Sequence, residues 1–556
     1  MKAQHLKRLS ITFLILSQSN PTTVVAQNNT AEIDKIFNWA TSETPGCVCA
    51  VSQNGKLVFN RAYGAANLEE KVPLTTNSVF DAGSLVKQFV AASTLKLVEE
   101  GQLSLSDDVQ KYIPELPDYG FTITVDHLLT HTSGLRDWTG IQKFSEGKED
   151  ALTLVLRQRS LDFIPGEEWA YSNSGYVLLK EIIARKTGMT FAEFTKRRLF
   201  NPLGMKSTLY TDEVGEVKNR ALGYDKKGGN WKQDILLEND RGGVGALFST
   251  AEDLIIWNNA LTNGYFGTYV TSKLKEPAIL SNGRKLNYAR GLFLDENRGG
   301  KVIWHTGSAA GYKSALSHYP ETGLSIAIMC NSGDGTDRIM FARQIFDLLV
   351  PATFSQKDQD KVPTPTQGGV TIGGMDLNSR TGMFFNKSGE PLQLVVEEGW
   401  LRVAAGPRLV ALSNNHFKRL GASLQFMSQD EFELRFLAND KLELKSMEGE
   451  TTMYRRAIQY VPAKADITGF TGRYRSDEIG AEFIIEAGEK GIIVRISHAP
   501  DKNLEFKPID TDAFGSGRMM VRFRRDKTGK VIAFDYGNPV LRKVSFAKVS
   551  SITTKS

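Results

Sequence analysis

The sequence predicts an α+β fold in the first part of the chain, an antiparallel sheet flanked by helices, followed by two small all-β barrels. Strand-like runs lie at both ends of residues 30–350, with helical periodicity between them. Beyond residue 370 the chain changes to short alternating strands separated by turn residues, and these contain an internal repeat.

Composition and charge favour a globular protein of several domains that does not bind nucleic acid. The chain has 556 residues, 41% apolar and 24% charged, which is ordinary for a globular protein of several domains. Three of the five net positive charges lie in residues 1–26, which hold no acidic residue. The remainder is almost neutral, so we expect no nucleic acid partner.

Residues 1–26 predict a cleaved signal peptide. Lys2, Lys7 and Arg8 precede a short apolar run, and Val24-Val25-Ala26 resembles a small-residue cleavage site. We therefore expect a periplasmic or secreted protein. The rest of the sequence holds no stretch of the length that a membrane span needs.

Three cysteines make an odd count for an exported protein. Cys47 and Cys49 are two residues apart in a strand pattern, which places them on one face. We expect Cys47, Cys49 and Cys330 to be buried free thiols rather than a disulfide or a metal site.

The first elements build one edge of the predicted sheet. Residues 30–40 show apolar positions at helical spacing and predict an amphipathic helix. Two strand-like runs, 47–52 and 56–63, flank Asn54-Gly55, the strongest short signal for a hairpin turn.

The next element is a helix over residues 84–100, apolar on nearly every side and therefore buried. Gly101 is placed to end it. Ser84 opens this helix and Lys87 follows three residues later, so that both side chains share one face. Burial lowers the pKa of a lysine toward the range in which it accepts a proton.

Further helices and strands complete the first part. Residues 125–135 predict a short helix that ends in a glycine-bearing loop, and residues 176–186 predict a helix closed by Gly188. Ser249-Thr250-Ala251-Glu252-Asp253 predicts a capping box. The last elements are strands over 301–307, 312–319 and 324–330 and a helix over 339–350.

The repeat predicts two similar units in the last part. Thr381-Gly382-Met383-Phe384 recurs 90 residues later as Thr471-Gly472-Arg473-Tyr474, and alternating runs follow each copy. One larger β-domain is the alternative. We expect a first domain over 27–352, a linker over 353–371, and β-barrels over 372–460 and 461–556.

Two motifs mark candidate chemistry. Ser-x-x-Lys occurs five times, but only the copy at Ser84 opens a buried helix. Tyr171-Ser172-Asn173 supplies a phenol and an amide in a polar loop, groups that can relay protons and orient a substrate. The second Tyr-x-Asn, at Tyr536, lies at a turn in the β-rich tail and is interpreted as structural.

Together with a third motif, this set resembles the penicillin-recognising serine hydrolases: class C β-lactamases, DD-peptidases, related esterases and D-aminopeptidases. Those enzymes carry Ser-x-x-Lys, Tyr-x-Asn and then Lys-Thr-Gly or His-x-Gly on a strand. His305-Thr306-Gly307 follows an apolar strand run and matches the last form. Lys-Thr-Gly occurs at residues 186–188 and 527–529, at a helix end and a turn, where the family does not place it.

The resemblance implies a fold and a set of roles. The fold is an antiparallel sheet flanked by helices with an all-helical subdomain, and the two-barrel tail is closest in layout to D-aminopeptidases. Ser84 would be acylated, Lys87 and Tyr171 would exchange the proton, and Asn173 would hold Lys87 and the substrate. The strand would contribute His305 to catalysis and Thr306, Gly307 and Ser308 to substrate binding. Which of Lys87 and Tyr171 is the base stays open.

No metal or cofactor is expected. His127 and His131 are four residues apart, but no third ligand falls at suitable spacing. The predicted function is an exported serine hydrolase that cleaves a peptide, amide or ester, with D-amino-acid peptides as the first class to test. The alternatives are a β-lactamase or DD-carboxypeptidase, and an acylated receptor or wall-binding protein without turnover. The oligomeric state is open.

Two further expectations follow from single features. At His305 the family's β-lactamases carry a lysine, whose charge helps to hold a substrate carboxylate. A mostly neutral histidine predicts a preference for amides or esters over free acids. The complete set of motifs before residue 350 predicts that a chain truncated after Val350 still folds.

Overall fold

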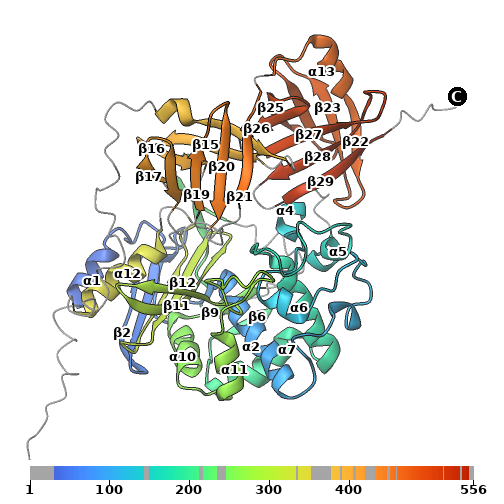
Figure 1. The fold of residues 1–556 in the computed structure, drawn as a ribbon. Helices are drawn as coiled ribbons and strands as arrows, with labels where there is room; N and C mark the ends of the chain where they lie inside the picture. Colours follow the sequence, from blue (N-terminus) through green and yellow to red (C-terminus); the bar gives the residue numbers. More distant parts are fainter. Residues whose placement is uncertain are drawn as a thin grey trace, which may run out of the picture.

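The structure is a computed structural model, and it describes residues 30–142, 144, 149–211, 217–234, 246–333, 336–351, 377–387, 391–397, 399–404, 409–419, 432–446, 451–458, 460–517, 519–538 and 541–549. The predicted signal peptide (1–26) and linker (353–371) lie outside these residues. Figure 1 shows a mixed lower part and two units above it that consist mainly of strands. The predicted α+β class with two following barrels is confirmed.

A six-stranded antiparallel sheet forms the centre of the first part. In spatial order its strands are β10 (Phe293–Asn297), β11 (Gly300–Ala309), β12 (Tyr312–Tyr319), β13 (Leu324–Cys330), β1 (Cys47–Gln53) and β2 (Lys56–Tyr63). The predicted hairpin is confirmed, because Asn54 and Gly55 both adopt positive φ angles, of 50° and 79°, between β1 and β2.

Helices cover both faces of this sheet. α1 (Thr30–Ile36) and α12 (Arg338–Leu349) lie together on one face (Figure 1), and α10 (Ala251–Thr262) packs on the other, where α2 (Val86–Glu99) contacts α10 through Phe89 and Gln88. As a result all residues of β1 but the last are buried. Alternation sends Cys47, Cys49 and Val51 toward α1 and α12, and Val48 and Ala50 toward the side that α10 covers.

The cysteine prediction was wrong for two of the three residues. Cys47 and Cys330 form a disulfide, and only Cys49 is a buried free thiol. The physical reason is strand pairing, since β1 and β13 are neighbours in the sheet and Cys47 lies directly opposite Cys330. The two residues are 283 positions apart in the chain, so local spacing could not reveal the pair.

The remaining elements of the first part lie between β2 and β10. They include three short sheets: β3 (Ala65–Asn67) with β4 (Val72–Pro73); β5 (Phe80–Asp81) with β9 (Ala246–Ser249) and β6 (Leu209–Thr211); and β7 (Tyr224–Lys227) with β8 (Asn230–Gln233). The helices are η3 (Val109–Lys111), α3 (Val125–Leu129), α4 (Trp138–Gln142), α5 (Ala151–Leu156), α6 (Asn173–Thr187), α7 (Phe191–Thr195), η4 (Lys196–Phe200), α8 (Asn201–Leu203) and α11 (Gly267–Leu274).

The predicted helix termini are largely confirmed. Gly188 ends α6 with φ of 68°, and Thr250 caps α10 by accepting a hydrogen bond of 3.1 Å from the Asp253 N–H. The capping box is only half formed, because the Asp253 carboxylate accepts hydrogen bonds from Ser207 and Thr208 instead. That tertiary contact joins α10 to the chain before β6.

Two eight-stranded antiparallel sheets follow, and the internal repeat is confirmed as their opening strands. After η6 (Leu377–Arg380), the first barrel consists of β14 (Gly382–Asn386), β15 (Pro391–Glu397), β16 (Trp400–Val403), β17 (Leu409–Ser413), β18 (His416–Arg419), β19 (Phe432–Phe436), β20 (Lys441–Ser446) and β21 (Thr451–Arg456). Pairing of β14 with β21 makes it nearly closed, with the gap between β16 and β17. One larger β-domain is therefore excluded.

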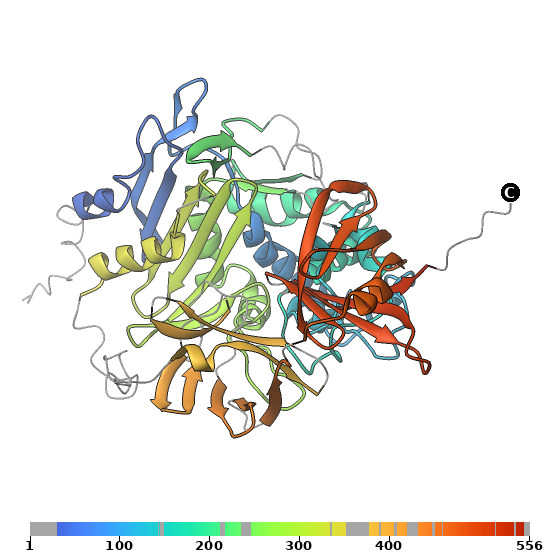
Figure 2. The same ribbon diagram turned by 90° about the horizontal axis from the view of Figure 1, so that it is seen from above.

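The second barrel is closed by pairing of its first and last strands. After α13 (Lys464–Phe470) it contains β22 (Gly472–Ser476), β23 (Ala481–Ala487), β24 (Ile492–Ile496), β25 (Ala499–Asp510), β26 (Ala513–Ser516), β27 (Met519–Arg525), β28 (Val531–Asn538) and β29 (Leu541–Lys548). It lies over α4 and α5, beside the first barrel (Figures 1 and 2).

The core of the second barrel is continuous with that of the first part. Phe144 packs its ring against Phe483 and Tyr536, with centroids 5.5 and 5.0 Å apart. The first barrel has a separate cluster of buried residues. In the part of the chain that the structure describes, no helix has the length and apolar character needed to cross a membrane.

Candidate active site

Ser84 lies in a short 3-10 turn, η2 (Gly83–Leu85), between β5 and the buried helix α2. Gly83 has φ of 54°, a conformation that favours glycine, and its N–H donates a hydrogen bond of 2.7 Å to Asp81 Oδ1. The predicted helix is thus confirmed, with its first residues in a tighter turn. This turn holds Ser84 at the edge of the helix bundle, opposite the end of β11.

Lys87 is buried beside Ser84. Its Nζ lies 3.3 Å from Ser84 Oγ and donates a hydrogen bond of 2.8 Å to Asn173 Oδ1. The rings of Tyr171 and Tyr176 lie 4.7 and 5.5 Å from the ammonium. Burial lowers the pKa of Lys87 to about 7, against the opposing effect of the Asp137 carboxylate. Lys87 can therefore lose and regain a proton near neutral pH.

Tyr171 and Asn173 come from the start of α6. Ser172 is the N-cap residue, Asn173 begins the helix, and Tyr171 precedes both. Burial raises the pKa of Tyr171 far above its usual range, against the opposing effect of a hydrogen bond with Ser84. Tyr171 is therefore a protonated phenol beside the serine.

Asp137 orients Asn173, and the sequence analysis missed it. Asp137 Oδ2 accepts hydrogen bonds from both the backbone N–H (3.1 Å) and Nδ2 (2.8 Å) of Asn173. With Nδ2 directed at the carboxylate, Oδ1 of the amide is directed at Lys87. Asp137 lies three residues after Gly134, in a stretch of mixed polar and apolar residues, and belongs to none of the short motifs that the sequence analysis used.

The end of β11 lies against the turn that carries Ser84. A Cβ atom added to Gly307 would lie 1.9 Å from the Ala82 carbonyl oxygen, and one added to Gly83 would lie 2.7 Å from the Ser308 nitrogen. Ser314 Oγ on β12 donates a hydrogen bond of 2.8 Å to the same Ala82 carbonyl. Both glycines are required for this approach, which brings the backbone of Ser308 next to Ser84.

His305 is close to Tyr171, with ring centroids 6.1 Å apart, but the protein occupies both of its nitrogens. Nδ1 lies 2.7 Å from the Thr306 carbonyl oxygen and must donate to it, so Nε2 accepts from the Tyr288 hydroxyl at 3.5 Å. Burial and the charge of Lys87 lower the pKa of His305 to about 3. His305 is thus a fixed neutral ring.

His131 completes this aromatic support. Its Nδ1 accepts a hydrogen bond of 3.2 Å from the Ser172 N–H, which leaves Nε2–H to donate to the Tyr288 hydroxyl at 3.1 Å. Its ring lies 4.4 Å from that of Tyr171. These contacts use both nitrogens of His131, and in the described parts of the chain no three His, Cys, Asp or Glu side chains lie close enough to hold a metal.

Thr306 and Ser308 leave β11 on the face opposite to His305. Thr306 lines a small cavity with Trp304, Ile339 and Ala342 beneath α12, so the structure does not bring its side chain to Ser84. Ser308 is exposed, and its Oγ accepts hydrogen bonds from Arg338 Nη2 (3.1 Å) and Lys313 Nζ (3.4 Å). Two cations therefore lie near the end of β11.

Comparison with known proteins places this geometry in context. The family model described as "Beta-lactamase" matches residues 33–349. Penicillin-binding protein 4* of Bacillus subtilis (strain 168) is 30% identical over 311 residues, which cover 51% of this chain and 68% of that protein. The D-aminopeptidase of Brucella anthropi is 24% identical over 536 residues, 91% of this chain and 95% of that protein.

A solved structure shows the same fold. The octameric penicillin-binding protein homologue from Pyrococcus abyssi matches with a TM-score of 0.51 at 24% identity, over 77% of this chain and 98% of that chain.

Proposed function

We propose that this chain, which belongs to the beta-lactamase family of serine hydrolases, cleaves amide and peptide bonds after an N-terminal D-amino acid through an acyl-enzyme on Ser84. The observation that carries the proposal is the contact of Lys87 Nζ with Ser84 Oγ at 3.3 Å, together with a Lys87 pKa of about 7. A lysine in this state can act as a base at working pH.

In the first chemical step, one proton moves from Ser84 to Lys87. Ser84 Oγ attacks the substrate carbonyl carbon while Lys87 Nζ takes the hydroxyl proton. The negative charge that develops on the carbonyl oxygen is stabilised by the backbone N–H groups of Ser84 and Ser308, which the approach of β11 to η2 brings together.

The second step breaks the amide bond. The proton held by Lys87 passes through the Tyr171 hydroxyl to the leaving nitrogen, and Tyr171 ends the step protonated as it began. Water then attacks the acyl-enzyme, its proton returns to Ser84 Oγ through the same groups, and the acid is released. Asn173, held by Asp137, keeps Lys87 directed at this path.

The substrate class rests on the similarity to the D-aminopeptidase of Brucella anthropi, which extends over both barrels. A panel of D- and L-aminoacyl p-nitroanilides, D-aminoacyl amides, short esters, D-Ala-D-Ala peptides and a chromogenic cephalosporin tests it. We expect kcat/KM at least tenfold higher for D- than for L-aminoacyl amides. Equal rates for both enantiomers, or turnover of the cephalosporin alone, would contradict this substrate class.

A second candidate, hydrolysis near a free C-terminal carboxylate, is favoured by the cations at Ser308. His305 contributes no charge, but Arg338 and Lys313 both contact Ser308 Oγ. A charge-assisted hydrogen bond contributes about 1.5–3 kcal/mol against about 1 for a neutral one. Measuring a matched amide and free-acid pair at pH 8 separates the candidates, and Arg338→Gln lowers kcat/KM for the acid alone if this cation holds the carboxylate.

The remaining alternative is a protein that is acylated on Ser84 without turnover. The same panel of substrates distinguishes it from an enzyme when product and protein mass are both measured. A receptor would keep a stable adduct of the substrate and show no product beyond one equivalent. An enzyme returns to its unmodified mass when the substrate is exhausted.

We also propose export of the chain. The basic and apolar pattern of residues 1–26 supports it, and so does the Cys47–Cys330 disulfide, because disulfides persist mainly in oxidising compartments. Fusing residues 1–30 to a reporter active only outside the cytoplasm tests export, and a silent, intact fusion would contradict it.

A further inference from the structure

We propose that Glu478 of the second barrel is a positioning residue for Lys87, which makes this barrel a working part of the active site. The proposal rests on the proposed function in one respect, since it takes Lys87 as the base for Ser84. Three steps of direct contact connect the two residues.

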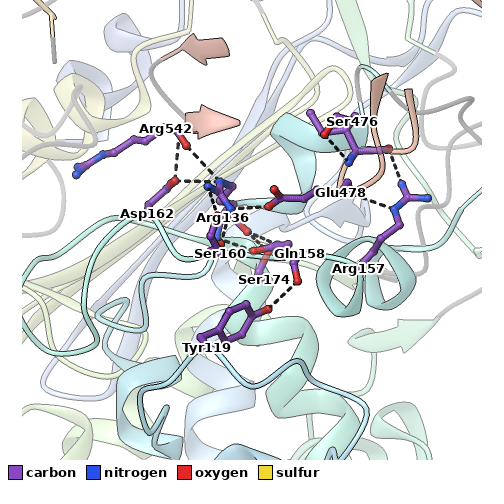
Figure 3. Close-up of polar contacts among 11 residues, drawn as sticks. Tyr119, Arg136, Arg157, Gln158, Ser160, Asp162, Ser174, Ser476, Glu478 and Arg542 are labelled. Carbon is purple, nitrogen blue, oxygen red and sulfur yellow. Dashed lines mark hydrogen bonds and ion pairs between the residues drawn. The ribbon is translucent and has the colours of Figure 1, made fainter. Parts of the chain in front are cut away.

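The first step is a buried ion cluster between the barrel and the helical part (Figure 3). Arg136, with only 2% of its side chain exposed, donates a hydrogen bond of 2.5 Å from Nη1 to Glu478 Oε1 in the turn between β22 and β23. Its Nε lies 3.1 Å from Asp162 Oδ1 and 3.2 Å from the Arg542 carbonyl oxygen of β29. Two residues of the barrel, Glu478 in a turn and Arg542 on β29, therefore hold one side of the guanidinium.

The second step leads from the Arg136 side chain to its backbone. The Arg136 N–H donates to Gln158 Oε1 at 3.0 Å, and the Arg136 carbonyl accepts from Gln158 Nε2 (2.9 Å) and Ser174 Oγ (2.6 Å). Ser174 Oγ also accepts from the Trp138 N–H at 3.0 Å. Residues 136–138 are thus fixed to the first turn of α6, where Figure 3 shows Ser174 beside the cluster.

The third step reaches the base. Asp137, between these fixed residues, accepts hydrogen bonds from the backbone and the amide of Asn173, and Asn173 Oδ1 accepts from Lys87 Nζ. A shift of Arg136 moves its neighbour Asp137, and a shift of Asp137 releases the Asn173 amide. The position of Lys87 relative to Ser84 Oγ therefore depends on the barrel. A displacement of about 1 Å is enough to lower the rate of catalysis.

A second contact at the same interface supplies the control. Arg157 donates hydrogen bonds to the carbonyl oxygens of Glu478 and Ile479 and pairs with Glu149 at 2.7 Å. These contacts hold the same turn of the barrel but do not involve Asp137. A variant that weakens only the Arg157 contacts therefore shows the effect of a weaker interface by itself. The additional effect of Glu478→Gln then comes from the contacts that lead through Arg136 and Asp137 to Lys87.

The experiment measures the rate at which an alkyl fluorophosphonate modifies Ser84, as a function of pH and per mole of folded protein. Ser84 Oγ bonds to phosphorus, fluoride leaves, and the serine proton goes to the base, so no natural substrate is needed. In Glu478→Gln we expect at least a tenfold lower plateau rate. We also expect the acid limb to move to lower pH, because Asp137 raises the pKa of Lys87 less as it moves away.

The structure shows which groups affect the pKa of Lys87, and therefore the pH at which the labelling rate falls on the acid side. Lys180 lowers the pKa of Lys87, Asp137 raises it, and the rings of Tyr171 and Tyr176 lie against the ammonium; Lys87 in turn lowers the pKa values of His131 and His305. None of these residues changes in Glu478→Gln.

Two control variants, Glu149→Gln and Glu478→Asp, separate a positioning role of Glu478 from a purely structural one. Glu149→Gln should keep the wild-type plateau and limb, and Glu478→Asp should recover part of the rate. Unchanged kinetics in folded Glu478→Gln, or an equal loss in Glu149→Gln, would overturn the positioning role. If Glu478→Gln does not fold, Arg136→Lys carries the same measurement, and failure of both to fold would assign the cluster a structural role only. Absence of labelling in the wild type would instead contradict the proposed function.

Discussion

At the scale of single residues, burial gives Lys87 the chemistry that the proposed reaction needs. An exposed lysine has a pKa near 10.4 and is a cation at neutral pH. Enclosed by Tyr171, Tyr176 and Asn173, Lys87 has a pKa of about 7, so about half of the molecules carry a neutral amine at that pH. The neutral amine is the form that can take the proton of Ser84.

We therefore predict that kcat/KM rises with pH through an acid limb near pH 7. The sign follows from the lowered pKa: below it Lys87 is protonated and inactive as a base, and above it the amine is free. A pH–rate profile on a D-aminoacyl p-nitroanilide checks this. A limb above pH 9 would mean that Lys87 keeps its ordinary pKa and is not the base.

A second prediction concerns His305→Lys, the substitution that gives this position the lysine found in the family's β-lactamases. His305 is 2% exposed and faces Lys87, which lowers its pKa. A second ammonium there would be buried and repelled. Leaving a buried charge unpaired costs about 3–5 kcal/mol, so we expect a clear loss of thermal stability and no gain for free acids. An increased acid-to-amide ratio in a stable variant would contradict this; Arg338→Gln is the matched comparison.

Residue types and spacing revealed only part of the site. Ser84, Lys87, Tyr171 and Asn173 stood out because each belongs to a short motif and the motifs occur in a fixed order. Asp137, Tyr288 and His131 act through contacts with residues far along the chain, such as Asp137 with Asn173 and Tyr288 with His305. Cys47 and Cys330 were misjudged for the same reason, since sheet pairing alone brings them together.

At the scale of elements, periodicity and turn chemistry were sufficient for most of the first part. Asn54-Gly55 identified the β1–β2 hairpin and Gly188 the end of α6, because each residue adopts a conformation that few others tolerate. The capping box at α10 was only half right. Its Asp253 bonds to Thr208 and Ser207, a tertiary contact that local sequence cannot show.

We predict that Thr250→Ala destabilises the protein by about 1 kcal/mol, through loss of the hydrogen bond to the Asp253 N–H at the start of α10. The urea concentration at the midpoint of unfolding should fall, and the activity per folded molecule should stay unchanged. Thr250→Ser is the control and should retain most of the stability. A drop in kcat without a change in the midpoint would show instead that this cap affects the site.

At the scale of the whole molecule, the second barrel completes the first part rather than following it. Phe144 packs on Phe483 and Tyr536, and Glu478 pairs with the buried Arg136. The alternation and the repeat predicted two barrels, but no local pattern could show that the core of one barrel is continuous with the core around α2.

This continuity reverses the expectation for a truncated chain. Ending the protein after Val350 would expose Phe144 and leave the buried Arg136 without Glu478, and breaking a buried ion pair costs about 3–5 kcal/mol. We predict an insoluble product, or a thermal midpoint about 6–20 °C below that of the full chain, from a shift of about 2–4 °C per kcal/mol. Measuring solubility and the thermal midpoint decides between the two expectations, and a soluble, fully active truncated protein would contradict the shared core.

The central claim, that Ser84 forms an acyl-enzyme with Lys87 as its base, is tested most directly by trapping the intermediate. The protein is mixed with a D-aminoacyl ester, quenched in acid within milliseconds to seconds, digested and mapped by mass spectrometry. We predict a mass increase equal to the acyl group on Ser84 in the wild type, none in Ser84→Ala, and a much slower increase in Lys87→Met. Acylation at another residue, or hydrolysis that persists in Ser84→Ala, would contradict it.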